Sequence, residues 1–492
     1  MKIWQQDWIS KWALYSPNAP AIQEFENGQT LTYQQLNNLG NCIVIQMQEL
    51  YSIKKGDRIV TLAEFSIPLI GLFVAAQKMG IILVPLNYRL APAEITDIIQ
   101  DAKPSMIIVE DKFKHLLSAA YDDLYFPLTK ISTDDTQNLP DQLDEVDEDD
   151  PIFIIYTSGT TGLPKGVKYT HKMAFWNSIN TAISLDISTK SKTINVMPPF
   201  HTGGWNVLLL PFLHHGGYTV LSKKFEADKV LNALDQMQCS IFMGVPTMLA
   251  LMAQEETFDQ TDLGHLDYII VGGESMPIPL IEKYAAKGVA IRQGYGMTEV
   301  GPNLTSLHQD DAIRKKGSIG RPNFYVKHRI ISESGLDAKP NEPGELWLKG
   351  PMVTSGYWQN ETMTKAAFSD DGKWFKTGDI VIEDDEKYLY IVDRLKNMYI
   401  SGAENVYPAE IEKVLRQLQE IKECAVIGVK DDKWGEVGKA FIVLNEPLTE
   451  ENILAYCIQQ LAKFKCPKYI VFVDALPKSD SGKIDRKSLK LL

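Results

Sequence analysis

Tyr156-Thr157-Ser158-Gly159-Thr160-Thr161-Gly162-Leu163-Pro164-Lys165-Gly166-Val167 is the stretch from which the fold of this chain can be worked out. It follows the apolar run Ile152-Phe153-Ile154-Ile155, which predicts a buried strand, so the stretch leaves a strand end and turns back over it. Its glycines let the backbone turn and direct N–H groups inward as an anion-binding nest. Hydroxyl and ammonium donors for phosphate oxygens come from Thr157, Ser158, Thr160, Thr161 and Lys165. The stretch therefore predicts a loop that binds phosphate.

Two other interpretations of this loop compete with phosphate binding. A Walker A loop ends in Gly-Lys-Ser/Thr at the start of a helix, whereas here Pro164 precedes Lys165 and Gly166 follows it. A mobile Gly/Ser/Thr linker is the alternative that composition alone favours. The complete spelling from Tyr156 to Val167, with Gly159 and Gly162, resembles the phosphate loop of the adenylate-forming superfamily. That superfamily contains acyl- and aryl-CoA synthetases, peptide-synthetase adenylation domains and luciferases, and it has further motifs in a fixed order.

Length and composition limit the class of protein. With 492 residues the chain is too long for one hydrophobic core and should divide into at least two domains. A formal net charge of −13 argues against binding to nucleic acid or to anionic lipid. The five cysteines show no metal-binding spacing, which indicates reduced thiols. The sequence has no apolar signal core and no apolar run of about 18 residues, so we expect a cytoplasmic protein without stable membrane insertion.

Short apolar runs alternate with helical spacing along much of the chain. Residues 58–63 and 81–86 are strand-like, residues 69–79 have helical spacing, and residues 30–33 are expected to open a helix. Such alternation predicts parallel βαβ units and therefore an α/β fold with a large N-terminal domain of parallel α/β layers. Later apolar runs, such as residues 268–271, end in polar or glycine turns, where an open α/β sheet binds its ligand.

The pattern of predicted helices and strands changes twice in the last third of the sequence. Short β runs with Pro/Gly turns begin at about residue 317 and predict a small β subdomain, and a new α+β pattern starts after Asp393. We place the N-terminal domain at residues 1–394, with the β subdomain at about 317–394, and a hinge at 395–396. A smaller, mobile C-terminal domain would occupy residues 397–492.

The segment Gln293-Gly294-Tyr295-Gly296-Met297-Thr298-Glu299 combines an aromatic ring between glycines with a hydroxyl and a carboxylate. Tyr295 offers a face to a purine, and Glu299 can hold a hard cation that bridges phosphate oxygens. Taken alone, the segment would more often be a tight turn with a surface acid. It resembles the superfamily's adenine and Mg²⁺ motif, which implies nucleotide contacts from Gly294, Tyr295, Gly296 and Thr298 and a metal ligand in Glu299. A second adenine-contacting turn is implied for Gly272, Gly273 and Glu274.

Two further motifs complete the nucleotide site that the resemblance implies. Lys376-Thr377-Gly378-Asp379 would place the Asp379 carboxylate on the ribose hydroxyls, and Arg394 would contact ribose or phosphate. Lys396 falls at the superfamily's hinge. Residues 477–486 match its terminal catalytic motif, in which Lys483 would neutralise the charge that develops between the carboxylate and the α-phosphate. Without these neighbours, residues 393–396 would be a charged hairpin and Lys483 a solvated surface charge.

Pro198-Pro199-Phe200-His201-Thr202-Gly203-Gly204-Trp205 resembles the superfamily's acyl-site motif, although an isolated His and Trp at this spacing would more often be packing residues. The resemblance implies that His201 borders the thiol channel and that Trp205 stands where some fatty acyl-CoA synthetases have an aromatic gate. Gly203 and Gly204 would leave room for an acyl chain or ring. Thr202 replaces the Asp of amino-acid-activating members, which disfavours an amino-acid substrate. The expected pocket is completed by Gly296, Pro302 and Asn303, whose amide suits a plain alkyl chain less well.

Residues that resemble the CoA contacts of related ligases occur in both halves of the chain. They are Arg89, Trp434, Phe464, Lys465 and Lys468, the last two flanking Cys466 at a position that can be basic. Gly402 and Ala403 belong to the strand expected to wall the pantetheine tunnel, where Ala403 adds a methyl group in place of a usual glycine. Asn397 is a second departure, since an acid is usual there.

Together these motifs cover nearly the whole chain, so we expect an ATP-dependent acyl-CoA synthetase, most like a bacterial-type fatty acyl-CoA synthetase, that uses ATP, Mg²⁺ and CoA. A small carboxylic acid, expected to be a medium- or long-chain fatty acid, would form acyl-AMP and pyrophosphate before rotation about Lys396 brings CoA to the adenylate. Catalysis is expected from Lys483, Thr298, Glu299, His201 and Lys165.

Three other functions remain open at this point. An aryl-CoA ligase would differ in the acyl pocket, and an acyl-AMP ligase that loads a carrier protein would ignore CoA. A non-catalytic nucleotide-binding module is disfavoured by the presence of Lys483, Glu299 and Asp379. A homodimer is one candidate assembly.

Overall fold

The computed structural model divides the chain into two compact units. It describes residues 7–132, 139, 143–157, 164–273, 276–401, 404–431, 434–461, 463–478 and 482–492. Unit 1 consists of Met1–His328 and Leu348–Phe375, and unit 2 of Arg329–Trp347 and Lys376–Leu492. The predicted hinge at residues 395–396 lies inside unit 2, and its role stays a prediction.

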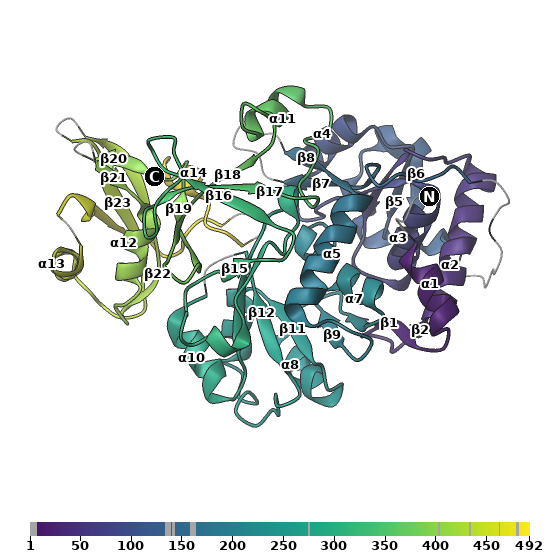
Figure 1. Ribbon diagram of the computed structural model, residues 1–492, viewed down its shortest axis with the longest axis horizontal. Coiled ribbons are helices and arrows are strands. Elements are labelled where there is room, and N and C mark those ends of the chain that lie inside the picture. Colours follow the sequence, from purple (N-terminus) through teal and green to yellow (C-terminus); the bar gives the residue numbers. More distant parts are fainter. Residues whose placement is uncertain are drawn as a thin grey trace. The chain divides into compact units, whose positions relative to one another are not determined.

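Unit 1 is built around three sheets (Figure 1). The six-stranded sheet has the order β6 (Tyr125–Pro127), β5 (Met106–Val109), β3 (Arg58–Leu62), β4 (Ile82–Pro85), β7 (Pro151–Thr157) and β8 (Lys165–Thr170). Its strands are parallel except for β8, which pairs antiparallel with β7. The alternation of strands and helices in the sequence therefore predicted this α/β architecture correctly.

The core of unit 1 forms where helices pack on this sheet. Apart from Pro68, every residue of α3 (Ile67–Met79) is buried. Helix α2 (Tyr33–Ile45) can approach α3 closely because Gly40 has no side chain: an added Cβ would lie 2.3 Å from Val74 Cγ1. The predicted helix start at residues 30–33 was placed slightly early, since Thr30–Thr32 form strand β2 and Thr32 caps α2 by accepting from the Gln35 N–H.

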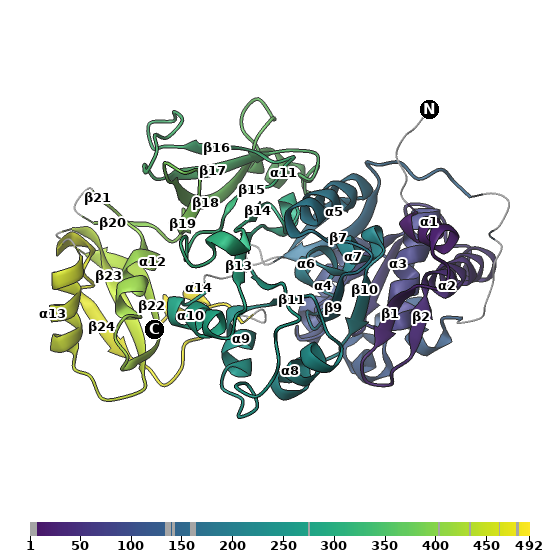
Figure 2. The same cartoon turned by 60° about the horizontal axis from the view of Figure 1, so that its bottom comes forward.

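Two smaller sheets complete unit 1. One has the order β2, β1 (Pro20–Glu24), β10 (Tyr218–Leu221) and β9 (Lys192–Asn195). The other has the order β11 (Ile241–Gly244), β12 (Tyr268–Val271), β13 (Ile291–Tyr295), β14 (Thr305–Ser306) and β15 (Arg321–Pro322). Helices lie around the second of these sheets (Figure 2), and their apolar faces share one core with it. The remaining helices of unit 1 are α1 (Trp8–Tyr15), α4 (Pro92–Ala102), α5 (His171–Leu185), α6 (Thr202–Asn206), α7 (Leu209–His215), α8 (Ala227–Gln236), α9 (Pro246–Met252), α10 (Ile278–Ala286) and α11 (Glu361–Ala367).

Unit 2 is dominated by two sheets. The first has the order β16 (Lys327–Ile331), β17 (Gly344–Lys349), β18 (Phe375–Glu383) and β19 (Leu389–Arg394). In the second, the long antiparallel pair β22 (Ile421–Asp431) and β23 (Gly435–Leu444) is joined by β20 (Tyr399–Ser401), β21 (Glu404–Val406) and β24 (Tyr469–Phe472). The helices of unit 2 are α12 (Pro408–Leu415), α13 (Glu450–Gln460) and α14 (Arg486–Leu489).

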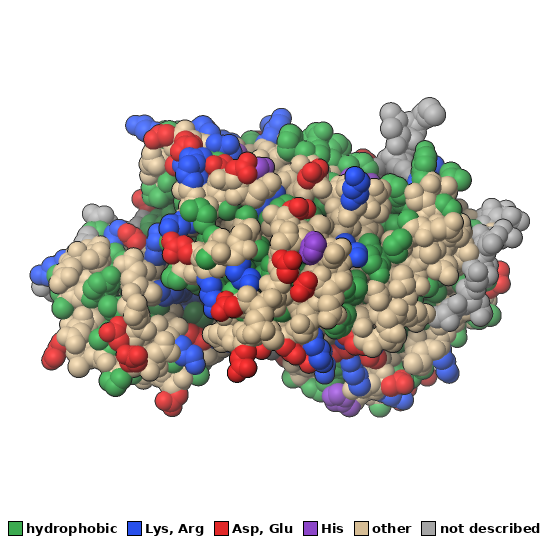
Figure 3. Space-filling view, turned by 90° about the horizontal axis from the view of Figure 1, so that it is seen from below, with side chains coloured by type: hydrophobic (Ala, Val, Ile, Leu, Met, Phe, Trp, Pro, Cys, Tyr) green, Lys and Arg blue, Asp and Glu red, His purple; other side chains and the backbone are tan. Residues whose placement is uncertain are grey.

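The surface and the cysteines agree with an ordinary globular chain. Acidic and basic side chains are interspersed over the face drawn in Figure 3. Within the described ranges, no helix combines the length and the apolar character that a membrane span requires. The five cysteines are free thiols, and burial raises the pKa of Cys424 and Cys239 to about 12, which makes both thiols poor nucleophiles.

Candidate active site

The ends of the predicted phosphate loop are held together by strand pairing. Strands β7 and β8 form an antiparallel pair in which Thr157 lies opposite Lys165. The loop residues Ser158, Gly159, Thr160, Thr161 and Gly162 lie outside the described residues. The pairing places the Thr157 and Lys165 side chains at the base of the same loop, as a phosphate-binding role for both requires.

A third segment joins β8 on its free side and was not expected from the sequence. The Lys168 N–H donates to the Gly356 carbonyl at 3.1 Å, and the Trp358 N–H donates to the Gly166 carbonyl at 2.7 Å. Between these two bonds lies Tyr357, which forms an isolated bridge with Val167. Gly356 has φ +130°, a conformation that favours glycine and turns the chain toward β8.

Tyr357 links two residues that the sequence placed in catalysis. Its hydroxyl donates to Glu299 Oε1 at 3.0 Å, and Lys165 Nζ lies 5.2 Å from the centroid of its ring. Burial, and next the negative charge of Glu299, raise the pKa of Tyr357 far above its usual value, so the phenol keeps its proton and acts as a donor. The residue type of Tyr357 does not indicate these contacts. The local sequence shows only a glycine before two aromatic residues, Tyr357 and Trp358.

Thr298 and Glu299 begin a short 3-10 helix at the end of the predicted adenine motif. Both side chains are buried, and the Thr354 N–H donates to the Glu299 carbonyl at 2.7 Å. Among the described residues, no cluster of three or more His, Cys, Asp or Glu side chains could hold a metal by itself. A single carboxylate is nevertheless the donor set expected for Mg²⁺, which commonly binds one or two carboxylates together with substrate phosphates and water.

The two predicted adenine-contacting turns lie at the ends of neighbouring strands. Strand β12 ends at Val271, just before Gly272 and Gly273, and pairs in parallel with β13, which runs into Tyr295 and Gly296. Gly272 is close to this turn, since an added Cβ would lie 3.6 Å from the Gly294 carbonyl oxygen. Neighbouring carboxyl ends of parallel strands are where open α/β sheets bind ligands. Glu274 of the same turn lies outside the described residues.

His201 and Arg89, assigned from the sequence to the thiol and CoA sites, both lie beside one aromatic ring, that of Phe200. The Arg89 guanidinium carbon lies 5.6 Å from the centroid of the Phe200 ring, and the centroid of the His201 ring lies 4.7 Å from the same centroid. Tyr88 meets Phe200 edge-on at 4.9 Å between centroids. The structure therefore brings together residues separated by more than one hundred positions.

Trp205, which the sequence placed at an acyl gate, lies in the hydrophobic core of unit 1, and its role as a gate stays a prediction. Its side chain is fully buried, and its indole N–H donates to the Pro199 carbonyl at 2.7 Å. The ring packs against Phe65, Phe153 and Phe73, with centroids 4.9, 5.1 and 5.8 Å away. Trp205 is a core residue, because it shares one buried hydrophobic cluster with these three phenylalanines.

The two glycines before Trp205 differ in the space around them. At Gly204 an added Cβ would lie 2.3 Å from the Pro198 carbonyl oxygen, so this glycine permits a close backbone approach and does not provide the expected room for an acyl chain. At Gly203 an added Cβ would meet only the methyl groups of Met197 and Met243, at 3.6 and 3.9 Å. Thr202 Oγ1 accepts from Asn206 Nδ2 at 3.1 Å, within α6. Of this group, Gly203 has the apolar surroundings that an acyl group would need.

The amide nitrogen of Asn303 donates to neighbouring residues and does not point into an open pocket. Its Nδ2 donates to Thr181 Oγ1 at 2.7 Å and to the Val207 carbonyl at 3.1 Å. The cavity beside Asn303 and Gly294 has a volume of about 10 Å³, enough for one water molecule. The backbone of Pro302 lies close to Gly296, where an added Cβ would be 2.1 Å from the Pro302 carbonyl oxygen. The donors of the Asn303 amide are therefore engaged inside unit 1, and its place at the acyl pocket stays a prediction.

In unit 2 the two predicted ribose and phosphate contacts form an ion pair. Asp379 lies opposite Arg394 on strands β18 and β19, and Arg394 Nε is 2.8 Å from Asp379 Oδ1. The Asp379 side chain is almost fully buried, whereas that of Arg394 is 44% exposed. A ligand can therefore reach the arginine without displacing the carboxylate from its position.

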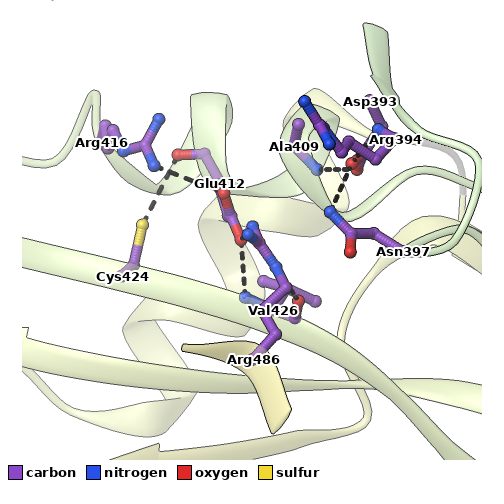
Figure 4. A network of polar contacts seen from close by, with 9 residues as sticks. All are labelled: Asp393, Arg394, Asn397, Ala409, Glu412, Arg416, Cys424, Val426 and Arg486. Atoms are coloured by element: carbon purple, nitrogen blue, oxygen red, sulfur yellow. Dashed lines mark hydrogen bonds and ion pairs between the residues drawn. The ribbon is translucent and has the colours of Figure 1, made fainter. Parts of the chain in front are cut away.

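The predicted hinge turn is fixed by Asp393, the residue before Arg394. Asp393 Oδ1 accepts from Asn397 Nδ2 at 3.0 Å, and Asp393 Oδ2 accepts from the Ala409 N–H at 2.8 Å, in the first turn of α12 (Figure 4). Lys396 is exposed at the tip of this turn. Asn397 departs from the acid that is usual in the superfamily, and the structure gives a reason: an amide donates to Asp393, whereas a carboxylate would repel it.

The predicted CoA contacts of unit 2 include two exposed aromatic rings and two neutralised lysines. Trp434 is 47% exposed and Phe464 is 38% exposed. Lys465 pairs with Glu410 at 2.7 Å, and Lys468 pairs with Asp431, which also accepts from the Trp434 N–H at 3.0 Å. The two lysines therefore offer less net charge to a CoA phosphate than the sequence suggested. Gly402 and Ala403 lie outside the described residues, next to Ser401, which pairs with Gly435.

Lys483 is exposed, on a segment whose two ends meet. Lys478 forms a bridge with Ile484, and the Asp485 N–H donates to the Pro477 carbonyl at 2.8 Å. The segment that bears Lys483 is therefore fixed to unit 2 at both ends, while the Lys483 side chain is exposed.

Comparison with known proteins agrees with this arrangement. Residues 9–358 match the family model of AMP-binding enzymes, and residues 410–483 match that of the AMP-binding enzyme C-terminal domain. The chain is 35% identical over 489 residues to the long-chain-fatty-acid–CoA ligase FadD13 of Mycobacterium tuberculosis, covering 97% of this chain and 96% of the relative. It is 34% identical over 483 residues to a feruloyl-CoA synthase of Amycolatopsis sp, again covering 97% and 96%.

A solved structure with the same architecture is o-succinylbenzoate CoA synthetase from Bacillus subtilis in complex with its acyl-adenylate intermediate. The TM-score is 0.89 at 29% identity, and the match covers 99% of this chain and 98% of that one. The same enzyme has also been solved with ATP and a magnesium ion, with a TM-score of 0.88 at 28% identity, covering 98% of this chain and 99% of that one.

Proposed function

Because the chain belongs to the family of AMP-binding enzymes, in which its relatives are acyl-CoA ligases, we propose that it activates a medium- or long-chain fatty acid and transfers it to CoA. It is an AMP-forming acid–thiol ligase that uses ATP, Mg²⁺ and CoA. The observation that most supports adenylate chemistry at this site is the contact of Tyr357 with both Lys165 and Glu299 at the base of the phosphate hairpin.

Two reactions would follow each other. A carboxylate oxygen of the acid attacks the α-phosphorus of ATP, forming the acyl–AMP bond while the bond to pyrophosphate breaks. The CoA thiolate then attacks the acyl carbon, and the bond to AMP breaks. Bound Mg²⁺ would neutralise charge on the phosphate oxygens, and Glu299 is the residue placed to hold it.

The chain's own residues would act mainly by position and charge. Lys165 at the base of the hairpin would attract the phosphates, and Lys483 would neutralise the charge that develops at the α-phosphate. Asp379, held by Arg394, would accept hydrogen bonds from the ribose hydroxyls. Arg89, exposed beside Phe200 and His201, would meet the CoA side of the site.

The choice of acid rests on fewer observations. A fatty acyl chain is supported by the fatty-acid-specific relative and by the methionine methyl groups around Gly203. The feruloyl-CoA and succinylbenzoate enzymes keep an aromatic acid as the second candidate. Trp205 supports neither candidate, since it belongs to the core.

The test is carboxylate-dependent release of pyrophosphate from Mg·ATP with straight-chain, benzoate-type and cinnamate-type acids, each with and without CoA. We expect the highest kcat/KM with medium or long alkyl acids, and AMP turnover that requires CoA. Activity confined to aromatic acids would replace the substrate proposed here, and CoA-independent turnover would favour transfer to a carrier protein.

Tyr357→Phe should weaken the response to Mg²⁺. The substitution removes the hydroxyl that orients Glu299 but keeps the ring beneath Lys165, so the apparent Mg²⁺ affinity in pyrophosphate release should fall by about tenfold or more. The matched control is Tyr284→Phe, which removes a buried hydroxyl that donates to the Leu249 carbonyl at 2.9 Å, away from the site. Equal Mg²⁺ titrations for the two variants would show that Tyr357 does not support the metal site.

A further inference from the structure

A buried ion pair lies beneath the segment that bears Lys483. Glu412, on α12, has a side chain that is only 3% exposed, and it accepts from Arg486, at the start of α14 (Figure 4). The same carboxylate accepts from the Val426 N–H at 2.8 Å on β22. Arg416, the C-terminal cap of α12, approaches its other oxygen at 3.3 Å. Glu412 thus joins α12, β22 and the C-terminal segment.

Burial raises the pKa of Glu412, and the positive charges of Arg486 and Arg416 oppose that rise. A buried carboxylate needs such partners, since an unpaired buried charge is strongly unfavourable. Replacing a buried pair by apolar residues is often neutral for stability, so the pair need not exist for stability alone. The pair also restricts geometry, because Glu412 and Arg486 keep their contact only while each side chain stays in its place.

Arg486 follows Lys483 by three residues, and three residues of extended chain span about 10 Å at most. The next side chain inward, Leu489, is buried in the core cluster that also holds Leu476 from the other end of the segment. Lys483 itself is exposed. A shift of Arg486 would therefore be passed to the backbone of Lys483, and misplacement by about 1 Å can cost catalysis about 100-fold.

We propose that the Glu412–Arg486 pair positions Lys483 for adenylate formation. Arg486 is a positioning residue, since its guanidinium contacts Glu412 inside unit 2. The proposal rests on the proposed function, in which Lys483 acts in the first reaction and not in the second.

Arg416 provides a matched control, because it contacts the same carboxylate from the opposite side. Removing either arginine takes one positive charge from Glu412. Only Arg486 lies close to Lys483 in the sequence, since Arg416 stands at the end of α12. Arg416 is 49% exposed and Arg486 is 24% exposed, so a purely structural role predicts a larger loss for Arg486 that affects both reactions alike. A positioning role predicts that Arg486 alone affects adenylate formation and spares thioester formation.

The experiment compares Arg486→Met with Arg416→Met in the full-length protein. For Arg486→Met we expect adenylate formation to fall by about 100-fold and thioester formation from supplied acyl-AMP to stay within about threefold. For Arg416→Met we expect both rates to stay within about threefold. Arg486→Lys, which keeps the charge on Glu412, should recover at least part of the loss and serves as the test variant if the methionine variant fails to fold. Equal losses in both reactions, or equal losses for the two arginines, would overturn the proposal.

A second readout does not depend on activity. Limited trypsin digestion should cleave after Lys483 several times faster in Arg486→Met than in Arg416→Met, because only the first variant loosens the segment. If the unsubstituted protein released no pyrophosphate with any acid, the proposed function would fail. Faster cleavage would then still show that Arg486 anchors the segment, and unchanged cleavage would remove that inference as well.

Discussion

Lys483→Ala should lower the rate of adenylate formation by about 10²- to 10³-fold while leaving thioester formation from supplied acyl-AMP nearly unchanged. The expected loss has a physical basis in charge, since attack on the α-phosphorus concentrates negative charge that a positioned ammonium can neutralise. Lys483 is exposed, on a segment whose ends are fixed at Lys478 and Ile484, so replacing it removes a charge without removing a core contact.

The measurement separates the two reactions. Pyrophosphate release in a single turnover reports the first, and thioester formation from chemically prepared acyl-AMP reports the second. Lys490→Ala is the control, because Lys490 is another exposed lysine of the same C-terminal segment. A parallel loss in both reactions would mean that Lys483 stabilises the protein or binds both substrates, and its assigned role would be wrong.

Much of the architecture was predictable from local pattern. Apolar runs such as residues 152–155 were long enough to identify strands, and alternation with helical spacing was enough to predict parallel βαβ units. The errors lay at boundaries: Thr30–Thr32 form a strand, because pairing with β1 outweighs the capping signal that begins only at Thr32. A short edge strand gains its stability from a partner that the local sequence does not show.

In the candidate site, too, local motifs were predictable and contacts between distant segments were not. Asp379 and Arg394 were found by motif, and the structure brings them to 2.8 Å. Tyr357 was missed, because its link to Glu299 depends on a segment 58 positions further along the chain pairing with β8. The burial of Trp205 was missed for the same reason: a tryptophan beside glycines has the composition of a ligand pocket, and only tertiary packing shows that its ring contacts three phenylalanines. Contacts between distant segments are therefore what the sequence could not supply.

Lys396→Pro should have the converse effect to Lys483→Ala, with thioester formation falling by about 100-fold and adenylate formation little changed. The Asn397 N–H donates to the Arg394 carbonyl at 2.9 Å, so Lys396 is the third residue of a four-residue turn. Proline there fixes its own φ near −65° and disfavours the helical conformation for Leu395, which restricts adjacent torsions of the hinge. The anchors on either side of the turn remain, because Asp393 still holds Asn397 and the Ala409 N–H.

Stiffening the hinge and removing the ammonium should therefore affect opposite reactions, which a general loss of stability cannot do. Lys396→Ala is the matched control, since it removes the same side chain and leaves the torsions free, and both of its half-reactions should stay close to those of the unsubstituted protein. If Lys396→Ala and Lys396→Pro behaved alike, the ammonium would be the important feature of this residue. If neither altered thioester formation, the two reactions would not be separated by rotation at this turn, and the proposed hinge would be wrong.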